Sequence, residues 1–180
     1  TVIASFPEMA FDVEFDAQRG RAYVSLPGSR ELRFVDLATG TTTQTAHFSE
    51  IPEEIALTPD GQRLWLALPA QTHSDYWFDE DQSGFLAGFD LAAGVQDRHF
   101  AIALDPYDLV ATPSGTLVVG SGSGQWTSIA AFDGASGAEL GTWVGAPGPA
   151  GATDAPVAPA RPAQATSART RALRELAEGL

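Results

Sequence analysis

Residues 55–67 read Ile55-Ala56-Leu57-Thr58-Pro59-Asp60-Gly61-Gln62-Arg63-Leu64-Trp65-Leu66-Ala67. The stretch is a short apolar run, a turn signal and a second apolar run. Pro59 presets φ for the second position of a turn, and Gly61 supplies a positive φ at its end. We therefore expect two antiparallel strands joined by a tight turn.

Two other segments repeat this pattern. Residues 109–120 carry the turn signal Thr112-Pro113-Ser114-Gly115 between two apolar runs. Residues 13–25 have a longer turn without Pro and form the weakest copy. Three residues fall at equivalent positions of the second strands, and we expect all of them in the core: Tyr23, Trp65 and Val118.

A second element follows each of these hairpins. It is an apolar run that ends in Asp-x-x-x-Gly, over residues 32–40, 86–94 and 129–137. The Asp side chain can accept hydrogen bonds from nearby backbone N–H groups, and Gly takes the left-handed conformation, so the pattern predicts a second hairpin. The aspartates Asp36, Asp90 and Asp133 lie 54 and 43 residues apart, which gives a period of about 43 with about 11 extra residues in the middle copy.

A period of 40–45 residues with four short strands is typical of a β-propeller blade. We predict an all-β fold, a partial β-propeller of about three four-stranded blades within residues 1–146. The blades are expected at about 5–50, 51–103 and 104–146. Known propellers have roughly four to eight blades, so three blades leave two apolar faces uncovered. Further blades of a longer polypeptide, or an oligomer, are expected to complete the ring.

The repeats resemble the YVTN family of bacterial β-propeller repeats, which also occurs in lactonase-like seven-bladed propellers. The resemblance rests on Thr58-Pro59-Asp60-Gly61 with Leu64-Trp65-Leu66, and on Phe34-Val35-Asp36-Leu37-Ala38-Thr39-Gly40. It covers roughly residues 5–145. It implies the propeller fold but says little about activity, because propellers host many functions. About three repeats are present here, whereas members of the family usually have about seven.

The composition excludes several classes of protein. The chain has 180 residues, of which 44% are hydrophobic and 18% charged, so it can bury a core and is not disordered throughout. It has no cysteine, which excludes disulfides and thiolate metal sites. It has no run of 18 apolar residues, so we expect no membrane insertion.

Acidic residues dominate the charge. There are 23 Asp and Glu against 10 basic residues, and residues 1–150 hold 20 acids and 6 Arg, a net charge of −14. Such a body repels phosphate backbones, so we expect no nucleic-acid partner. The charge serves solubility or marks a cation-binding surface. Together with the resemblance, the acidic, lysine-free surface favours an extracytoplasmic location: periplasm, cell surface or secreted.

The last part of the chain differs in composition. Residues 147–168 are rich in Ala, Pro, Gly and Thr with almost no large apolar side chains, which is typical of a linker or tail. Residues 169–180 contain good helix formers, with Leu173, Leu176 and Leu180 at helical spacing. We expect a short amphipathic helix there, or a disordered tail, whose Arg residues could dock on the acidic body.

The sequence motifs of common enzyme sites are missing. The chain contains no nucleophile elbow, phosphate-binding loop or dinucleotide fingerprint. His47 and His99 occupy matching places in two repeats, which favours a structural or surface role for both. His73 lies in the extra segment of the middle copy and could contribute to a site there.

That extra segment, residues 71–84, is the most unusual part of the chain. It places three adjacent aromatic residues beside four acids. Loops on a rigid scaffold commonly carry binding residues. We therefore expect Tyr76 and Trp77, together with Trp126 in a glycine-rich loop, to be binding residues. Local packing of these aromatic side chains is the alternative.

The same segment contains a candidate calcium loop. Carboxylate and hydroxyl oxygens at alternating positions can converge on one hard cation, and a backbone carbonyl follows at the seventh position. The expected ligands are Asp79, Asp81, Ser83, Phe85 and Asp90. The flanking residues are strand-like, and Asp90 has counterparts in the other repeats, so an ordinary acidic turn is the alternative.

These observations favour a non-catalytic propeller module that binds a protein or a glycan, as a portion of a larger propeller. The alternative, implied by the resemblance, is a lactonase-like hydrolase that acts on sugar lactones. No catalytic residue can be assigned, because the sequence offers no acid–base or metal-ligand set beyond the candidate calcium loop.

Overall fold

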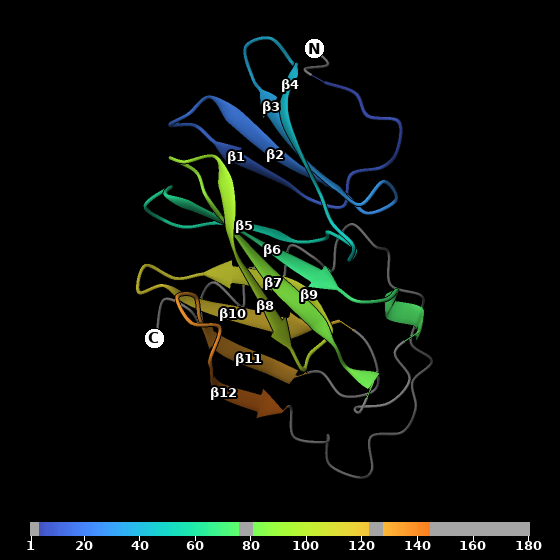
Figure 1. Ribbon diagram of the computed structural model, residues 1–180, viewed down its shortest axis with the longest axis vertical. Helices are drawn as coiled ribbons and strands as arrows, with labels where there is room; N and C mark the ends of the chain where they lie inside the picture. The colour runs from blue at the N-terminus through green and yellow to red at the C-terminus, as the bar shows by residue number, and fades with distance from the viewer. Residues whose placement is uncertain (1–3, 76–80, 123–127, 145–180) are drawn as a thin grey trace, which may run out of the picture.

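The computed structural model describes residues 4–75, 81–122 and 128–144. Within these residues the chain forms three antiparallel sheets of four strands each (Figure 1). The predicted all-β fold is therefore confirmed. A 3-10 helix, η1 (His73–Asp75), follows the second strand of the second sheet. The predicted linker and C-terminal helix, residues 147–180, lie outside the described residues.

Each sheet is a meander whose strands pair in chain order. The first sheet comprises β1 (Val13–Asp16), β2 (Arg21–Leu26), β3 (Glu31–Asp36) and β4 (Thr42–His47). The second comprises β5 (Ile55–Leu57), β6 (Arg63–Pro69), β7 (Gly84–Asp90) and β8 (Val95–Ile102). The third comprises β9 (Pro106–Ala111), β10 (Thr116–Ser121), β11 (Ser128–Asp133) and β12 (Glu139–Val144).

The hairpin between the third and fourth strands of each sheet forms as the sequence predicts. The Oδ1 atoms of Asp36, Asp90 and Asp133 accept hydrogen bonds from the backbone N–H groups two and three residues later. These bonds, chiefly the one from the residue three positions later, hold the pKa of each carboxyl group below its usual range. The glycines that close the turns have positive φ: 70° at Gly40, 69° at Gly94 and 74° at Gly137.

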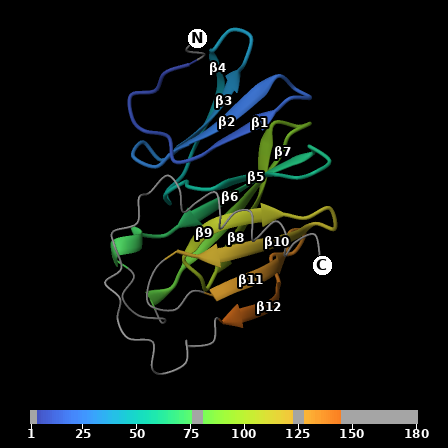
Figure 2. The same ribbon diagram turned by 180° about the vertical axis from the view of Figure 1, so that it is seen from behind.

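The three sheets lie side by side, with the second between the first and the third (Figures 1 and 2). The first strands of neighbouring sheets are in contact, β5 with both β1 and β9. We call β1, β5 and β9 the inner strands, and β4, β8 and β12 the outer strands.

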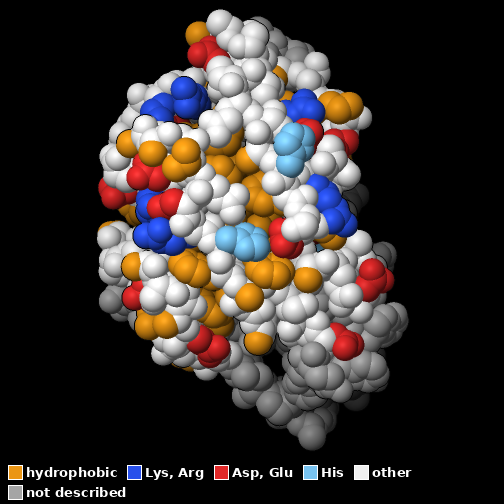
Figure 3. Space-filling view, in the orientation of Figure 1, with side chains coloured by type: hydrophobic (Ala, Val, Ile, Leu, Met, Phe, Trp, Pro, Cys, Tyr) orange, Lys and Arg blue, Asp and Glu red, His pale blue; other side chains and the backbone are white. Residues whose placement is uncertain are grey.

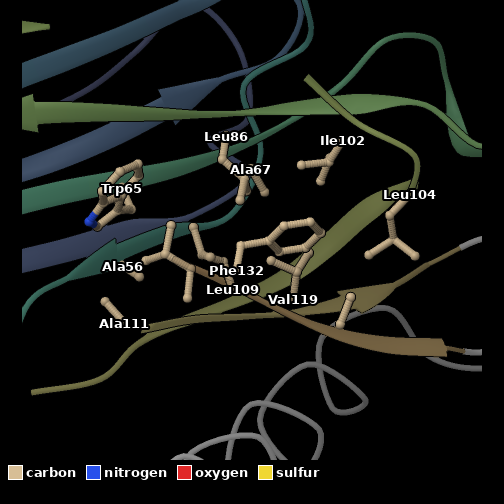
Figure 4. Close-up of a cluster of buried hydrophobic side chains, with 12 residues drawn as sticks. Ala56, Trp65, Ala67, Leu86, Ile102, Leu104, Leu109, Ala111, Val119 and Phe132 are labelled. Atoms are coloured by element: carbon tan, nitrogen blue, oxygen red, sulfur yellow. The ribbon is translucent and has the colours of Figure 1, made fainter. Parts of the chain in front are cut away.

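Apolar side chains fill the two spaces between the sheets. Tyr23 and Phe34 of the first sheet pack against Leu64 and Leu66 of the second. On the other face of the second sheet, Trp65 packs with apolar residues of the third, as Figure 4 shows. Each large side chain buried in this way contributes about 1.5–3 kcal/mol. The predicted core positions are confirmed, since Tyr23, Trp65 and Val118 are 0%, 2% and 0% exposed.

The two ends of the sheets carry different connections. The tight turns after the first and third strands lie at one end, the turn end. The connections after the second strands, and those from an outer strand to the next inner strand, lie at the other, the loop end. The insertion between β6 and β7 therefore emerges at the loop end. No helix in the described ranges is long and apolar enough to cross a membrane.

Candidate functional site

An acidic residue stands at the loop end of every inner strand. Positions can be matched between sheets through the residue that opens the first tight turn, because its side chain accepts a backbone N–H across that turn in each sheet. These residues are Asp16, Thr58 and Thr112. Four residues before them stand Asp12, Glu54 and Asp108. The three sheets thus bring equivalent carboxylates to the loop end.

These equivalent acids are withdrawn from solvent. Glu54 is 6% exposed and Asp108 is fully buried. Asp12 is half-buried and joins two sheets, because its Oδ2 accepts the backbone N–H of Ile55 at 2.9 Å. Over the face shown in Figure 3, by contrast, acidic and basic side chains are interspersed. Glu54 and Asp108 are therefore removed from the solvated surface, and Asp12 links the first sheet to the second.

His73 lies between two further carboxylates at this end. One ring N–H, at Nδ1, donates to Asp105 Oδ2 at 2.8 Å, and the other, at Nε2, donates to Glu53 Oε2 at 2.5 Å. Asp105 is fully buried and Glu53 is 6% exposed. Burial opposes the charged imidazole, but the hydrogen bonds to Asp105 and Glu53 outweigh it and raise the pKa of His73 to about 9. His73 is therefore an imidazolium at neutral pH.

Aromatic rings complete this cluster. The ring of Tyr107 meets His73 edge to face, with centroids 4.9 Å apart, and meets Phe11 in the same manner at 5.9 Å. Each equivalent acid is directly preceded by a residue of this cluster: Phe11 before Asp12, Glu53 before Glu54 and Tyr107 before Asp108. We call the whole set the loop-end cluster; its members are Phe11, Asp12, Glu53, Glu54, His73, Asp105, Tyr107 and Asp108.

The cluster holds both ends of the insertion between β6 and β7. His73 comes from the first part of the insertion and binds Asp105. Gln82 comes from its last part, and its Oε1 accepts the backbone N–H of the same Asp105 at 3.0 Å. Residues 70–83 are therefore attached to the start of the third sheet at two points.

This arrangement limits what His73 can do chemically. A general base or a metal ligand needs a free imidazole lone pair. Both ring nitrogens of His73 donate to carboxylates, so neither is available. Asp105 Oδ1, in contrast, is buried without a hydrogen-bond partner among residues 4–75, 81–122 and 128–144. Such an acceptor costs about 1–3 kcal/mol unless a donor reaches it.

The predicted binding residues Tyr76, Trp77 and Trp126 lie outside the described residues. The strands around them still fix where their loops begin and end. Residues 76–80 belong to the β6–β7 connection and residues 123–127 to the β10–β11 connection. Both connections belong to the loop end.

The predicted calcium ligands do not all come together. Asp79 lies outside the described residues, whereas Ser83 Oγ donates to the backbone carbonyl of Asp81. Phe85 and Asp90 belong to β7, and Asp90 is at its far end, in the turn described above. The structure corrects the assignment of Asp90, because the first six residues of the extended strand β7 separate it from the insertion. In the described part of the chain, no three His, Asp or Glu side chains are grouped to hold a metal ion. A site at Asp79, Asp81 and Ser83 stays a prediction.

The other two histidines lie on the surface. The side chains of His47 and His99 are 69% and 38% exposed. His99 stacks on Phe85 with ring centroids 4.8 Å apart. This agrees with the structural or surface role expected for both.

A cleft of about 310 Å³ lies at the turn end, between the second and third sheets. Arg63 and Arg98 line it, but both pair with Asp97. Trp65 also lines it and is only 2% exposed, so its ring cannot stack on a ligand. The loop end therefore offers the better candidate site.

Glu53 and Asp105 were not predicted from the sequence. A signal was present, because each of the three repeat units begins one residue after an acid: Asp12, Glu54 or Asp108. Glu53 and Asp105 are close to this position.

Comparisons with protein-family models and with curated proteins find no match for this chain.

Proposed function

We propose that the three sheets are blades of a β-propeller and form a portion of a larger ring. Three sheets of the same strand order, with inner strands in contact and equivalent turns, support this assignment. In such a ring the inner strands surround the axis, so the loop-end cluster lies at one mouth of the central channel.

We further propose that the protein is a non-catalytic binding module, and that its partner contacts the loop end. The observation that carries this proposal is the attachment of the insertion to Asp105 through both His73 and Gln82. A loop attached at two points loses less entropy when it binds, which favours affinity. Its sequence supplies Tyr76 and Trp77, the residue types that dominate binding energy at interfaces.

The charge of the molecule favours a basic protein surface as the partner, and a glycan is the other candidate. The insertion contains Asp75, Asp79, Glu80 and Asp81, within a body of net charge −14 over residues 1–150. Charges of this sign speed association with basic partners and repel nucleic acids and anionic membranes. An extracytoplasmic location, in the periplasm, on the cell surface or outside the cell, remains part of this proposal.

A lactonase-like hydrolase that acts on sugar lactones is the second candidate. The convergence of carboxylates from all three sheets favours it, because a hydrolase can use such groups as general acids or bases or as metal ligands. The engagement of both His73 nitrogens argues against it.

Binding can be tested by titration calorimetry with an Arg-rich peptide, a Glu-rich peptide of equal length and a panel of soluble glycans. We expect heat with the Arg-rich peptide that disappears in the Tyr76→Ala, Trp77→Ala double variant. Trp143→Ala is the matched control, since Trp143 is exposed but lies in β12. Hydrolysis of sugar lactones, with or without a divalent metal, would overturn the non-catalytic assignment.

A further inference from the structure

Each sheet has one face toward the preceding sheet and one toward the next. In the second sheet, Ile55 and Leu57 of the inner strand pack toward the first sheet. In the third, Leu109 and Ala111 pack toward the second. The three-sheet alignment makes Val13 and Phe15 the equivalent pair in the first sheet.

This pair is more exposed than its counterparts, of which Leu57 is half-buried and the other three are buried. Val13 is 37% and Phe15 61% exposed, whereas Ile55, Leu109 and Ala111 are 3%, 2% and 7% exposed. A fully buried phenylalanine contributes about 1.5–3 kcal/mol, so leaving Phe15 in water forgoes most of that stabilisation. The same face of β2 is nevertheless covered, since Ala22 and Val24 are 4% and 2% exposed.

The cover over β2 comes from residues 4–10. Ala4, Phe6 and Ala10 pack against the cluster that contains Ala22 and Val24. Counted back from the equivalent acids, Ala4 and Phe6 match Ala46 and Phe48, and also Phe100 and Ile102. Those residues end an outer strand or follow it directly, and they pack on the sheet that comes next.

The backbone confirms this match. Phe11 N–H donates to the Ser25 carbonyl, and Ser25 N–H donates to the Asp12 carbonyl. In the second sheet, Glu53 N–H donates to the Ala67 carbonyl, and Ala67 N–H donates to the Glu54 carbonyl. Phe11 and Asp12 thus pair with β2 as Glu53 and Glu54 pair with β6, and residues 4–10 hold the place beside the first sheet that residues 46–52 hold beside the second.

Resting on the proposed ring of blades, we infer that a fourth four-stranded sheet of the same kind packs against β1, with an outer strand that continues directly into residues 4–6. Its remaining strands cover Val13 and Phe15 with bulky side chains at the position of Tyr23 and Trp65. A second copy of this chain fits less well. Trp143 of its third sheet is equivalent to Ala4, because Ile129 pairs with Trp143 as Leu32 pairs with Ala46, so a docking copy would have to displace residues 4–6.

The inference can be tested by supplying the sheet. Residues 53–99 of the second sheet are placed directly before Ala4, so that Ala4 takes the place of Phe100. We expect a monomer that melts at a higher temperature than the 180-residue chain. Phe15→Ser should lower the melting temperature of this four-sheet protein by roughly 5 °C or more and leave that of the parent chain nearly unchanged. An equal effect in the two proteins would overturn the inference.

A labelling measurement covers the case in which the enlarged protein does not fold. The chain has no cysteine, so Phe15→Cys introduces a single thiol. We expect this thiol to react as fast in the folded 180-residue chain as in the denatured chain, and sedimentation to give a monomer. A protected thiol in a dimer that Phe15→Asp dissociates would overturn the inference and assign the face to a second copy.

Discussion

His73 and Asp105 are 32 positions apart in the sequence, yet His73 Nδ1 lies 2.8 Å from Asp105 Oδ2. This bond attaches the insertion of the second sheet to the start of the third. Because Glu53 holds the other ring nitrogen, one imidazolium lies between two buried carboxylates, which precede the neighbouring inner strands β5 and β9. The loop end is therefore organised by charge pairing in addition to apolar packing.

Replacement of His73 should destabilise the protein. His73→Ala leaves the carboxylates of Glu53 and Asp105 buried without their cation, which costs about 3–5 kcal/mol. His47→Ala is the matched control, because His47 is largely exposed and its nitrogen lies 3.6 Å from Glu31. We expect the control to change the free energy of unfolding by no more than about 0.5 kcal/mol. Urea denaturation measures both, and similar values for the two variants would contradict the role of His73.

Stability should depend on pH through the same residue. The pKa of His73 is raised from 6.5 to about 9, so its contribution is fully present below pH 6.5 and is lost as the pH rises through 9. The loss amounts to about 3 kcal/mol over this range. Denaturation curves between pH 6 and 10 measure it, and His73→Gln should abolish this part of the slope. A slope that persists in the variant would assign it to other groups.

The contact between Gly88 and Trp65 should be sensitive to a single methyl group. A Cβ at Gly88, in β7, would lie 2.8 Å from the Trp65 ring, whereas one at Gly141, in β12, meets nothing within 4 Å. Gly88→Ala should therefore destabilise the protein by about 1–3 kcal/mol. Gly141→Ala should be neutral or slightly stabilising. Thermal unfolding of the two variants tests the packing of the Trp65 ring over Gly88 on the neighbouring strand of the second sheet.

Two turn glycines should differ although both have positive φ. Gly20 has a φ of 63° and nothing within 4 Å of an added Cβ, while a Cβ at Gly137, with a φ of 74°, would clash with the Phe100 ring. Gly20→Ala should cost about 1 kcal/mol from backbone strain alone. Gly137→Ala should cost clearly more, because the ring of Phe100 must also move. Equal losses on denaturation would mean that the turn of the third sheet does not contact β8.

The repetitive part of the fold is readable from the sequence because it depends on local chemistry. The turns form through hydrogen bonds from neighbours two and three residues away to Asp36, Asp90 and Asp133. The burial of Tyr23 and Trp65 follows from the alternation of side chains between the two faces of a strand. The contacts of His73 with Glu53 and Asp105 were not predicted, because they join residues far apart in the sequence through charge pairing across sheets. Asp90 was assigned to a calcium loop because the spacing matched, whereas strand pairing places it in a turn. The exposure of Phe15 likewise becomes visible only when its counterparts are seen packed.

The central claim is that the contacts of His73 with Glu53 and Asp105 hold the insertion at the loop end for binding. The most direct measurement is the affinity for the Arg-rich peptide, by calorimetry at pH 7, of the unaltered chain and of the His73→Gln, Trp77→Ala and Trp143→Ala variants. If the claim holds, His73→Gln and Trp77→Ala each weaken binding at least tenfold in a protein that is still folded, and Trp143→Ala leaves it unchanged. Unchanged affinity in the first two variants, or a loss confined to Trp143→Ala, would contradict it.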